Sequence, residues 1–457
     1  MHWIAHLEGG PRRVNHAAVA LGDQIFSFGG YCSVGEDYEQ TRPLDIHVLD
    51  SVTFRWSALP LPAREDPQYE ETPFQRYGHT CVAYNGKAYL WGGRNDSDGA
   101  SNQLHEFDPV TCRWRWIGVK GHVPPARDGH SACVIGDQML IFGGFEEEFQ
   151  RFSQETYAFD FTTCTWRELP TVGVAPSWRD FHTAIPLGNC MYIFGGRSDQ
   201  MGQFHSNREF YNDKLKYLCL ADNTWYEPMV QGEAPCGRRS HSAWSYDGKM
   251  YVWGGYSGQM RKHFNSFYEY NPERSTWRRL FPGGEGPKPR RRHCCAMIGS
   301  RLFLFGGTSP VEPKDVASSA SSLSSSAPSS PEVAGHAHGP GPAGDAVVEL
   351  NLHHENVVAP PHPMLHIAVA LAPHAPAPPP VINAANSPLK NLVDHSDLYV
   401  LDFDPSLKTL SALSVLEQKL LESRQIEELL PWDVRLELRS MSVPNRIGAP
   451  RIPFVFG

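Results

Sequence analysis

The stretch from Arg239 to Gly255 reads R-S-H-S-A-W-S-Y-D-G-K-M-Y-V-W-G-G. It opens with Arg and His, alternates up to Asp247-Gly248, and then runs through a second apolar segment to two glycines. An Asp-Gly pair between two alternating runs predicts a tight β-hairpin, because both turn residues need positive φ angles. This stretch is therefore expected to form two antiparallel strands.

The same pattern occurs six times in the 457 residues. A glycine pair closes each copy at intervals of 51 to 63 residues, namely Gly29-Gly30, Gly92-Gly93, Gly143-Gly144, Gly195-Gly196, Gly254-Gly255 and Gly306-Gly307. The His residues that open the copies are His16, His79, His130, His182, His241 and His293. A third strand such as 155–160 follows, and a fourth strand carries Trp56, Trp114, Trp166, Trp225 or Trp277. A period of about 50 residues with a glycine pair is the kelch signature, and four strands build one propeller blade.

The two ends of the repeat region indicate how the blades close into a ring. Residues 2–7 read as a fourth strand without the other three, whereas the sixth copy lacks its fourth-strand Trp. We therefore expect an all-β fold, a six-bladed kelch β-propeller over residues 1–404 that the N-terminal strand closes. Within it, residues 308–394 are rich in Ser, Ala, Pro and His and are expected to be a disordered insertion in blade six.

The chain after the propeller changes to helical spacing. Asp404-Pro405 predicts a helix start, and a second start follows at Leu430-Pro431. Residues 405–442 are therefore expected to form short helices, which either cap the ring or dock a partner. Residues 443–457 contain Pro444, Gly448 and Pro453 and are expected to be a flexible tail.

Composition narrows the classes of function. The formal net charge of −9 argues against direct binding of nucleic acid. The ten Cys form no C-x-x-C pair, so we expect no metal and no other cofactor. No apolar run long enough for a membrane span and no signal peptide occur, so we expect the cytoplasm, with the nucleus as a second location.

Arginines recur in two loops of each copy. They precede the opening His or follow the glycine pair directly, at Arg12, Arg13, Arg76, Arg127, Arg179, Arg238, Arg239, Arg290, Arg291 and Arg292, and at Arg94 and Arg197. Both loops leave an antiparallel blade on the same face, so these side chains should converge on one mouth of the ring. Guanidinium groups bind carboxylates through paired hydrogen bonds, which predicts an anion pocket there. The repeated His is expected to be a structural hydrogen-bonding group, and no catalytic group stands out.

A resemblance to a known family covers the whole chain outside 308–394. The segments 12–19, 91–95, 126–133, 178–182 and 204–207 resemble the kelch-repeat substrate receptors of cullin-2 ubiquitin ligases. The segment 406–415 is similar to an elongin C-binding box, and the segment 430–434 is similar to the cullin-2 box that follows it.

This resemblance implies a non-catalytic receptor that binds C-terminal glycine degrons and leads to ubiquitination and proteasomal degradation. The implied carboxylate contacts are Arg197 and either Arg239 or Ser240. The arginine-rich loops add Arg94, Trp178, Arg179 and Arg292 to the expected degron-binding residues. The implied elongin C contacts are Ser406, Leu407, Ser411 and Val415, and the implied cullin-2 contacts are Leu430, Pro431 and Val434. The implied partners are elongin B/elongin C, cullin-2, a RING subunit through the cullin, and proteins with a C-terminal glycine.

Three points stay open at this stage. A relative has Arg-Ser-Trp-His where this chain has Arg238-Arg239-Ser240-His241, so Arg239 and Ser240 both remain candidates for the carboxylate contact. Gly457 could make the chain a ligand of its own ring, or the tail could simply be solvated. The alternative function is a nuclear chromatin-binding kelch scaffold with a role in meiotic recombination.

Overall fold

The computed structural model describes residues 1–33, 42–206, 208–311, 392–417 and 430–448. The chain divides into one unit of Met1–Pro310 with Asn391–Gly457 and a second unit of Val311–Lys390. Nearly all described residues belong to the first unit, which the following paragraphs describe. Most of the predicted insertion, together with residues 418–429 and Gly457, lies outside the described residues.

The first unit is mostly β structure, as the sequence predicts. Sheet 1 consists of β2 (Ala17–Leu21), β3 (Gln24–Phe28), β4 (Ile46–Asp50) and β5 (Arg55–Ala58). Sheet 2 consists of β6 (Tyr77–Tyr84), β7 (Lys87–Asn95), β9 (Leu104–Asp108) and β10 (Arg113–Trp116). Sheet 3 consists of β13 (Ser131–Ile135), β14 (Gln138–Phe142), β17 (Thr156–Asp160) and β18 (Thr165–Glu168).

The other three sheets repeat this order. Sheet 4 consists of β20 (Thr183–Leu187), β21 (Cys190–Phe194), β24 (Lys216–Cys219) and β25 (Thr224–Tyr226). Sheet 5 consists of β27 (Ser242–Tyr246), β28 (Lys249–Trp253), β31 (Phe267–Asn271) and β32 (Thr276–Leu280). Sheet 6 consists of β33 (Cys294–Ile298), β34 (Arg301–Phe305), β37 (Leu398–Asp402) and β1 (His2–Leu7).

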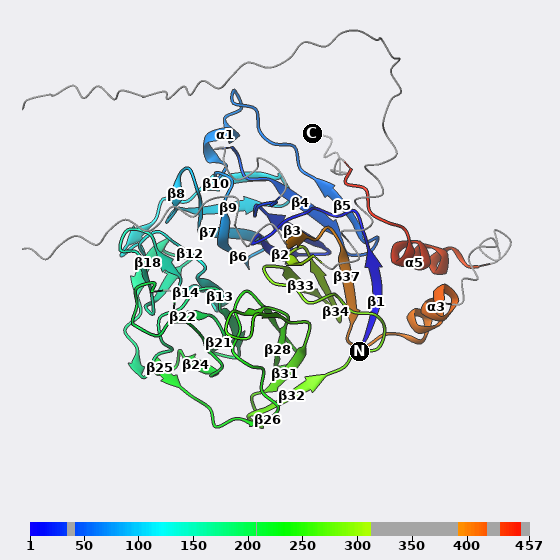
Figure 1. Cartoon of the computed structure of the whole chain (residues 1–457). Helices are drawn as coiled ribbons and strands as arrows, with labels where there is room; N and C mark the ends of the chain where they lie inside the picture. Colours follow the sequence, from blue (N-terminus) through cyan, green and yellow to red (C-terminus); the bar gives the residue numbers. More distant parts are fainter. Residues whose placement is uncertain (34–41, 207, 312–391, 418–429, 449–457) are drawn as a thin grey trace, which may run out of the picture. The chain divides into compact units, whose positions relative to one another are not determined.

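The six sheets follow one another in a closed cycle. The first strand of each sheet contacts the first strands of two neighbours, in the order β2, β6, β13, β20, β27, β33 and back to β2 (Figure 1). The N-terminal strand β1 pairs with β37, from His2 opposite Asp402 to Leu7 opposite Leu398. The expectation that the N-terminal strand completes the last repeat is therefore confirmed.

Apolar side chains fill the spaces between neighbouring sheets. Phe26 and Phe28 of sheet 1 pack with Phe107 and Trp114 of sheet 2, and each of the other clusters likewise joins adjacent sheets. The six Trp residues on the outer strands are at most 7% exposed: Trp3, Trp56, Trp114, Trp166, Trp225 and Trp277. Burial of one Trp side chain typically contributes a few kcal/mol to the free energy of unfolding, so each repeat stabilises its neighbours.

Short strands extend the loops and edges of the sheets. Two- and three-residue strands are β8 (Gly99–Ala100), β11 (Lys120–Gly121), β12 (Arg127–Asp128), β15 (Phe145–Glu146), β16 (Arg151–Phe152), β19 (Val172–Gly173), β22 (Arg197–Asp199), β23 (Glu209–Tyr211), β26 (Gln231–Gly232), β29 (Tyr256–Ser257), β30 (Lys262–His263), β35 (Thr308–Pro310) and β36 (Leu392–Asp394). Strand β35 pairs with β36, so the two ends of the predicted insertion 308–394 are strands of the sheet structure. The insertion therefore begins after Pro310 and ends before Leu392. Thr308 lies opposite Asp394 in this pair, which directly follows the glycine pair Gly306-Gly307.

One short helix, α1 (Gln68–Glu71), lies in the loop before sheet 2. Two C-terminal helices pack against the ring of sheets. Helix α3 (Leu407–Glu417) contacts α5 (Trp432–Ser442), which in turn contacts β1. The predicted start at Asp404-Pro405 is wrong by two residues, because the Ser406 hydroxyl accepts the backbone N–H of Thr409 at 3.1 Å. Ser406 therefore caps the helix and leaves Leu407 as its first residue.

The segment after α5 departs from the prediction of a flexible tail from residue 443. Asn445 is 4% exposed, and its backbone N–H donates to the carbonyl of Glu8 at 2.6 Å. Ala58 donates to the carbonyl of Gly448 at 3.0 Å, so the segment lies along the outer strand β5. It covers a sheet edge that would otherwise have unpaired backbone groups, which explains why it is ordered despite Pro444.

Candidate functional site

A closed circle of backbone hydrogen bonds lies where the six repeats meet. It is formed by the residues that precede each opening His, namely Asn15, Gly78, Gly129, Phe181, Ser240 and Arg292. Each of these N–H groups donates to the carbonyl of the preceding member at 2.7–3.0 Å, and Asn15 donates to Arg292. All six have positive φ angles between 50° and 68°, which turns the backbone toward the common centre. These residues and the opening His residues line a cavity of about 120 Å³, called the mouth below.

The opening His residues join neighbouring repeats. His130 Nε2 lies 2.7 Å from the Thr80 hydroxyl, and His182 Nε2 lies 2.7 Å from the Ser131 hydroxyl. His79 and His241 make the corresponding contacts with the preceding sheets. Burial lowers the pKa of His79 and His241 to about 3, so these rings are neutral. The prediction of a structural hydrogen-bonding role is confirmed for these residues.

Five arginines before the opening His residues are buried and hydrogen-bonded inside the ring. Each donates from Nη1 to the carbonyl of the first glycine of its own pair, at 2.8–3.3 Å, and they are Arg76, Arg127, Arg179, Arg238 and Arg290. Arg179 also donates to Asn212 at 3.0 Å and is 3% exposed. The structure thus places Arg179, a residue expected for degron binding, in the framework of its sheet rather than at the mouth.

A rim of six backbone pairs surrounds the mouth. Each pair joins the residue two positions before the opening His to the residue after the glycine pair: Val14 with Tyr31, Tyr77 with Arg94, Asp128 with Phe145, Asp180 with Arg197, Arg239 with Tyr256, and Arg291 with Thr308. The predicted convergence of both arginine-bearing loops on one face is therefore confirmed. The side chains differ from repeat to repeat, so the rim has sectors of different charge.

The sector of sheets 2 to 4 contains arginines with carboxylate partners. Arg197 binds both oxygens of Asp180 and lies 3.1 Å from Glu209, which raises the pKa of the guanidinium. Arg94 lies 3.5 Å from Glu147. Burial, and then the charge of Asp180, raise the pKa of the Asp128 carboxyl to about 7. Arg94 and Arg197 are therefore at the rim as predicted, but their charges are largely neutralised within the protein.

The sector of sheets 5 and 6 has a different character. No carboxylate oxygen of a described residue lies within 4 Å of Arg239, Arg291 or Arg292 in the structure. Arg239 and Arg291 lie 5.6 and 4.6 Å from the ring centroid of Tyr256, and Arg292 donates to the Tyr31 hydroxyl. Arg291 was missed as a site residue, although it occupies the same position before His293 that Arg239 occupies before His241.

Several buried donors in this region have no hydrogen-bond partner among the described residues. The Ser240 hydroxyl is unpaired although Ser240 is only 8% exposed, and it lines the mouth. The Nε atoms of Arg239, Arg291 and Arg292 and the Nε1 of Trp178 are also without partners. Buried donors are normally satisfied, so these groups indicate a place for an acceptor from outside the chain. The arrangement is suited to binding an anion.

The predicted docking residues on the C-terminal helices are partly exposed. Leu407 is 83% exposed at the start of α3, whereas Val415 is half-buried against the ring. The Ser411 hydroxyl donates to the carbonyl of Leu407 at 2.8 Å. Pro431 is exposed, and Leu430 and Val434 pack partly on the core. Trp432, which the sequence analysis did not single out, is 69% exposed.

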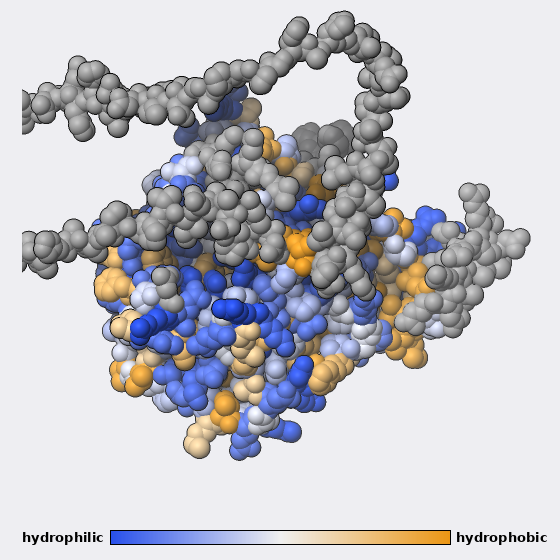
Figure 2. Space-filling view, viewed as in Figure 1, coloured by the Kyte–Doolittle hydropathy of each residue, from blue (hydrophilic) through white to orange (hydrophobic). Residues whose placement is uncertain are grey.

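The hydropathy of the surface agrees with these exposed apolar residues on the C-terminal helices. Orange side chains gather over α3 and α5, whereas the face of the sheets in the same view is mostly blue (Figure 2). None of the helices in the described ranges is long and apolar enough to cross a membrane.

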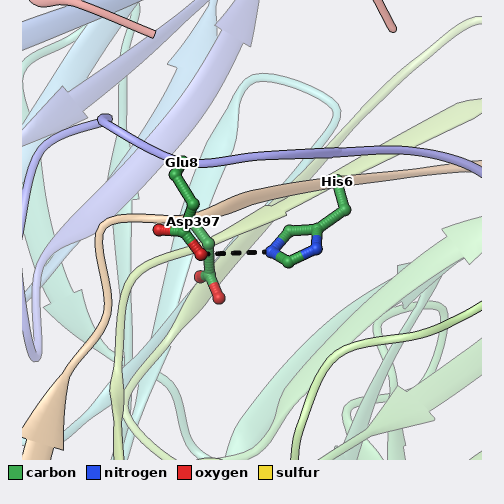
Figure 3. A group of neighbouring side chains, drawn as sticks. All are labelled: His6, Glu8 and Asp397. Carbon is green, nitrogen blue, oxygen red and sulfur yellow. Dashed lines mark ion pairs between the residues drawn. The ribbon is translucent and has the colours of Figure 1, made fainter. Parts of the chain in front are cut away.

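One cluster of potential metal ligands lies where β1 meets β37. The ligand atoms of His6, Glu8 and Asp397 lie within 4.8 Å of one another (Figure 3). Both oxygens of Asp397 are already bound by Arg290, at 2.5 and 2.8 Å, and His6 lies 3.3 Å from Glu8. The Arg290–Asp397 ion pair and the contact between His6 and Glu8 therefore account for this cluster without a metal.

Comparisons with known proteins agree with the repeat pattern. The sequence model of the KLHDC2/KLHL20/DRC7 Kelch-repeats domain matches residues 78–307. Kelch domain-containing protein 3 of Bos taurus is 41% identical over 452 residues, which cover 98% of each chain. The Homo sapiens protein of the same name is 40% identical over 451 residues, again with 98% of each chain. Host cell factor 2 of Homo sapiens is 29% identical over 252 residues, which are 52% of this chain and 31% of that one. The chain belongs to the kelch-repeat family that contains Kelch domain-containing protein 3.

Proposed function

We propose that the chain is a six-bladed kelch propeller and the non-catalytic substrate receptor of a cullin-2 RING ubiquitin ligase. The mouth binds the free carboxylate of proteins that end in glycine, and the C-terminal helices recruit elongin B/elongin C and cullin-2. The RING subunit joins through the cullin, and bound substrates are ubiquitinated and degraded by the proteasome. Such a receptor would work in the cytoplasm and the nucleus.

The unpartnered donors at the mouth carry this proposal. Arg239 and Arg292 have no carboxylate partner among the described residues, and the Ser240 hydroxyl is buried without an acceptor. A carboxylate would accept from these three groups at once, through charge-assisted hydrogen bonds. The cavity of about 120 Å³ holds few heavy atoms, which favours a residue without a side chain at the end of the bound peptide.

Three further rim residues have secondary roles in the proposal. Asp180 and Glu209 already bind the guanidinium of Arg197. Arg197 can therefore bind the peptide carboxylate only if these two side chains give up part of their hydrogen bonds to it. Arg94 adds positive charge at longer range, and Trp178 provides an indole N–H without a partner beside the rim. Arg179 is left out of the contact surface, because its donors are used inside sheet 4.

The exposed residues of α3 and α5 support the ligase part of the proposal. Leu407 at 83% exposure is an apolar side chain without a place in the core, as expected for an anchor that enters a pocket on elongin C. Ser406, Ser411 and Val415 complete that box, and Leu430, Pro431 and Val434 form the cullin-2 box. The alternative chromatin scaffold leaves these exposed apolar side chains without a role.

Reconstitution tests the proposal as a whole. The full chain is mixed with elongin B/elongin C, cullin-2 and its RING subunit, ubiquitin, E1 and E2 enzymes, and a reporter that ends in glycine. We expect chains of ubiquitin on this reporter, and none on a matched reporter with one extra C-terminal Asp. Equal modification of both reporters, or no association with elongin C, would contradict the proposal.

A further inference from the structure

The sector of sheets 5 and 6 has more guanidinium groups than one carboxylate can bind. Arg239, Arg291 and Arg292 together carry three positive charges without an ion-pair partner among the described residues, in contrast to Arg94 and Arg197. A bound peptide terminus would bring one negative charge to this sector. Two guanidinium groups would still lack a carboxylate within 4 Å in a partly buried site, although the charges of Glu209 and Asp128 act on Arg239 and Arg292 at longer range.

The three guanidinium groups also lie close enough to repel one another. Burial, followed by the charges of Arg292 and Arg239, lowers the pKa of Arg291 to about 10. Burial, followed by the charges of Arg291 and Arg239, lowers the pKa of His263 to about 4. An anion with more than one negative charge would relieve this repulsion most strongly.

The donors of this sector match the oxygens of a tetrahedral anion. The Nε atoms of all three arginines, the buried Ser240 hydroxyl and the Nε2 of His263 have no partner. Ser240 is more than nine-tenths buried and lines the mouth, so its hydroxyl points to a ligand independently of the arginines. A phosphoryl group offers three terminal oxygens and about 1.5 to 2 negative charges at pH 7, whereas a carboxylate offers two oxygens and one charge.

We propose that Arg239, Arg291, Arg292 and Ser240 form a phosphoryl-binding site that overlaps the carboxylate site of the mouth. Phosphate and a peptide terminus would then compete for the same donors, and the phosphate level would set the apparent affinity for peptides. The phosphoryl group can come from free phosphate or from a phosphorylated side chain near the end of the peptide. The competition rests on the proposed function, whereas direct phosphate binding does not.

Titration calorimetry on the full chain tests direct binding. Inorganic phosphate is compared with acetate at the same pH and ionic strength, so that screening by salt is equal. We expect phosphate to bind at least tenfold more tightly than acetate. Arg291→Gln should weaken phosphate binding about tenfold, and Arg292→Gln, measured separately, should do the same, so that the test survives if one variant fails to fold. Arg278→Gln is the matched control, because Arg278 lies on the outer strand of sheet 5 with 63% of its side chain exposed.

A second arm distinguishes the two sources of the phosphoryl group. C-terminally amidated peptides with and without a phosphoserine near the end are compared in phosphate-free buffer. Tighter binding of the phosphorylated peptide supports a phosphorylated side chain as the ligand, whereas phosphate binding without such a gain supports the free anion. If phosphate and phosphoserine both bind no better than acetate, the proposal is wrong. That result would leave the carboxylate site standing, because its test uses unphosphorylated peptides.

Discussion

Arg197 binds Asp180 at two points, with its Nε 3.0 Å from Oδ1 and its Nη2 on Oδ2. Glu209 lies on the same guanidinium at 3.1 Å from Nη1. The arginine that follows the glycine pair in sheet 4 is therefore occupied before any ligand arrives, whereas Arg239 one sheet further is not. An incoming carboxylate has to share Arg197 with two acidic side chains of the chain itself.

This relationship predicts an unusual gain of affinity. Asp180→Asn removes one competitor for Arg197 and should tighten binding of a glycine-ended peptide severalfold. The measurement is fluorescence anisotropy with a labelled peptide, with a melting curve to show that the variant is folded. Asp160→Asn at the end of β17, where the side chain bonds to Thr162 and Thr163, is the control and should leave the affinity unchanged. Unchanged affinity in a folded Asp180→Asn variant would place the ligand carboxylate away from Arg197.

The start of α3 gives a prediction about assembly. Leu407→Ala should abolish co-purification with elongin B/elongin C, because the most exposed apolar side chain of this helix is lost. The melting temperature of the ring should stay the same, since Leu407 packs on nothing in the core. Leu410→Ala on the same helix, where the side chain is 39% exposed, should reduce association far less. Full retention of elongins by Leu407→Ala would remove the box assignment.

The opening His residues predict acid sensitivity. Burial lowers the pKa of His16, His79 and His241 to about 3, from the usual 6.5. Between these values the unfolded chain binds protons that the folded ring does not bind, so the free energy of unfolding falls as the pH falls below 6.5. Each such His contributes about 1.4 kcal/mol per pH unit.

Urea unfolding between pH 7.5 and 5.5 measures this dependence. His241→Gln should flatten the slope below pH 6 by about 1.4 kcal/mol per pH unit relative to the parent chain. His122→Gln, whose side chain is 63% exposed, is the control for a His-to-Gln substitution outside the buried set. If His241→Gln keeps the parent slope, the buried imidazole rings are not neutral in the folded chain.

Gly9 gives a prediction about the link between the helices and the ring. It has a φ of +88°, and a Cβ at this position would overlap with the carbonyl oxygen of Asn445. Gly22 has a φ of +64° with no atom within 4 Å of such a Cβ, so Gly22→Ala has the same backbone strain without the clash. Gly9→Ala should therefore lower the free energy of unfolding by more than the roughly 1–2 kcal/mol expected for Gly22→Ala. Equal losses would show that the segment 445–448 moves away without cost.

The repeat was predictable from sequence because its signals are local. Each signal depends on backbone angles or burial within one repeat, as for the Asp247-Gly248 turn, the glycine pairs and the outer Trp residues. Six copies show the same signals, so the pattern is clear from the sequence. The pairing of β1 with β37 was predictable because one repeat lacked a strand and the chain began with one. The arginine-rich loops could be assigned to one face by the same reasoning.

Other features depend on contacts that no single segment encodes. Arg179 and Arg239 both precede an opening His, but their one-residue difference in position takes its meaning only from the fold: Arg179 bonds to Gly195 and Asn212 inside its sheet, whereas Arg239 lies at the rim. The pairing of Arg197 with Asp180 joins two loops seventeen positions apart, and it neutralises a residue that the family pattern implies for binding. Residues 445–448 looked flexible because Pro444 and Gly448 suggest a loop, whereas the open edge of β5 orders them.

The affinity of one peptide in two forms tests the central claim most directly. A peptide that ends in glycine is measured with a free and with an amidated C-terminus, against the parent chain and Arg239→Gln. We predict that amidation weakens binding to the parent at least thirtyfold, because charge-assisted bonds of a partly buried carboxylate are typically worth about 2 kcal/mol or more. Arg239→Gln should bind the free peptide more weakly and discriminate less between the two forms, because only Arg292 and Ser240 remain as donors. Equal affinity of the parent chain for the free and the amidated peptide would contradict the account.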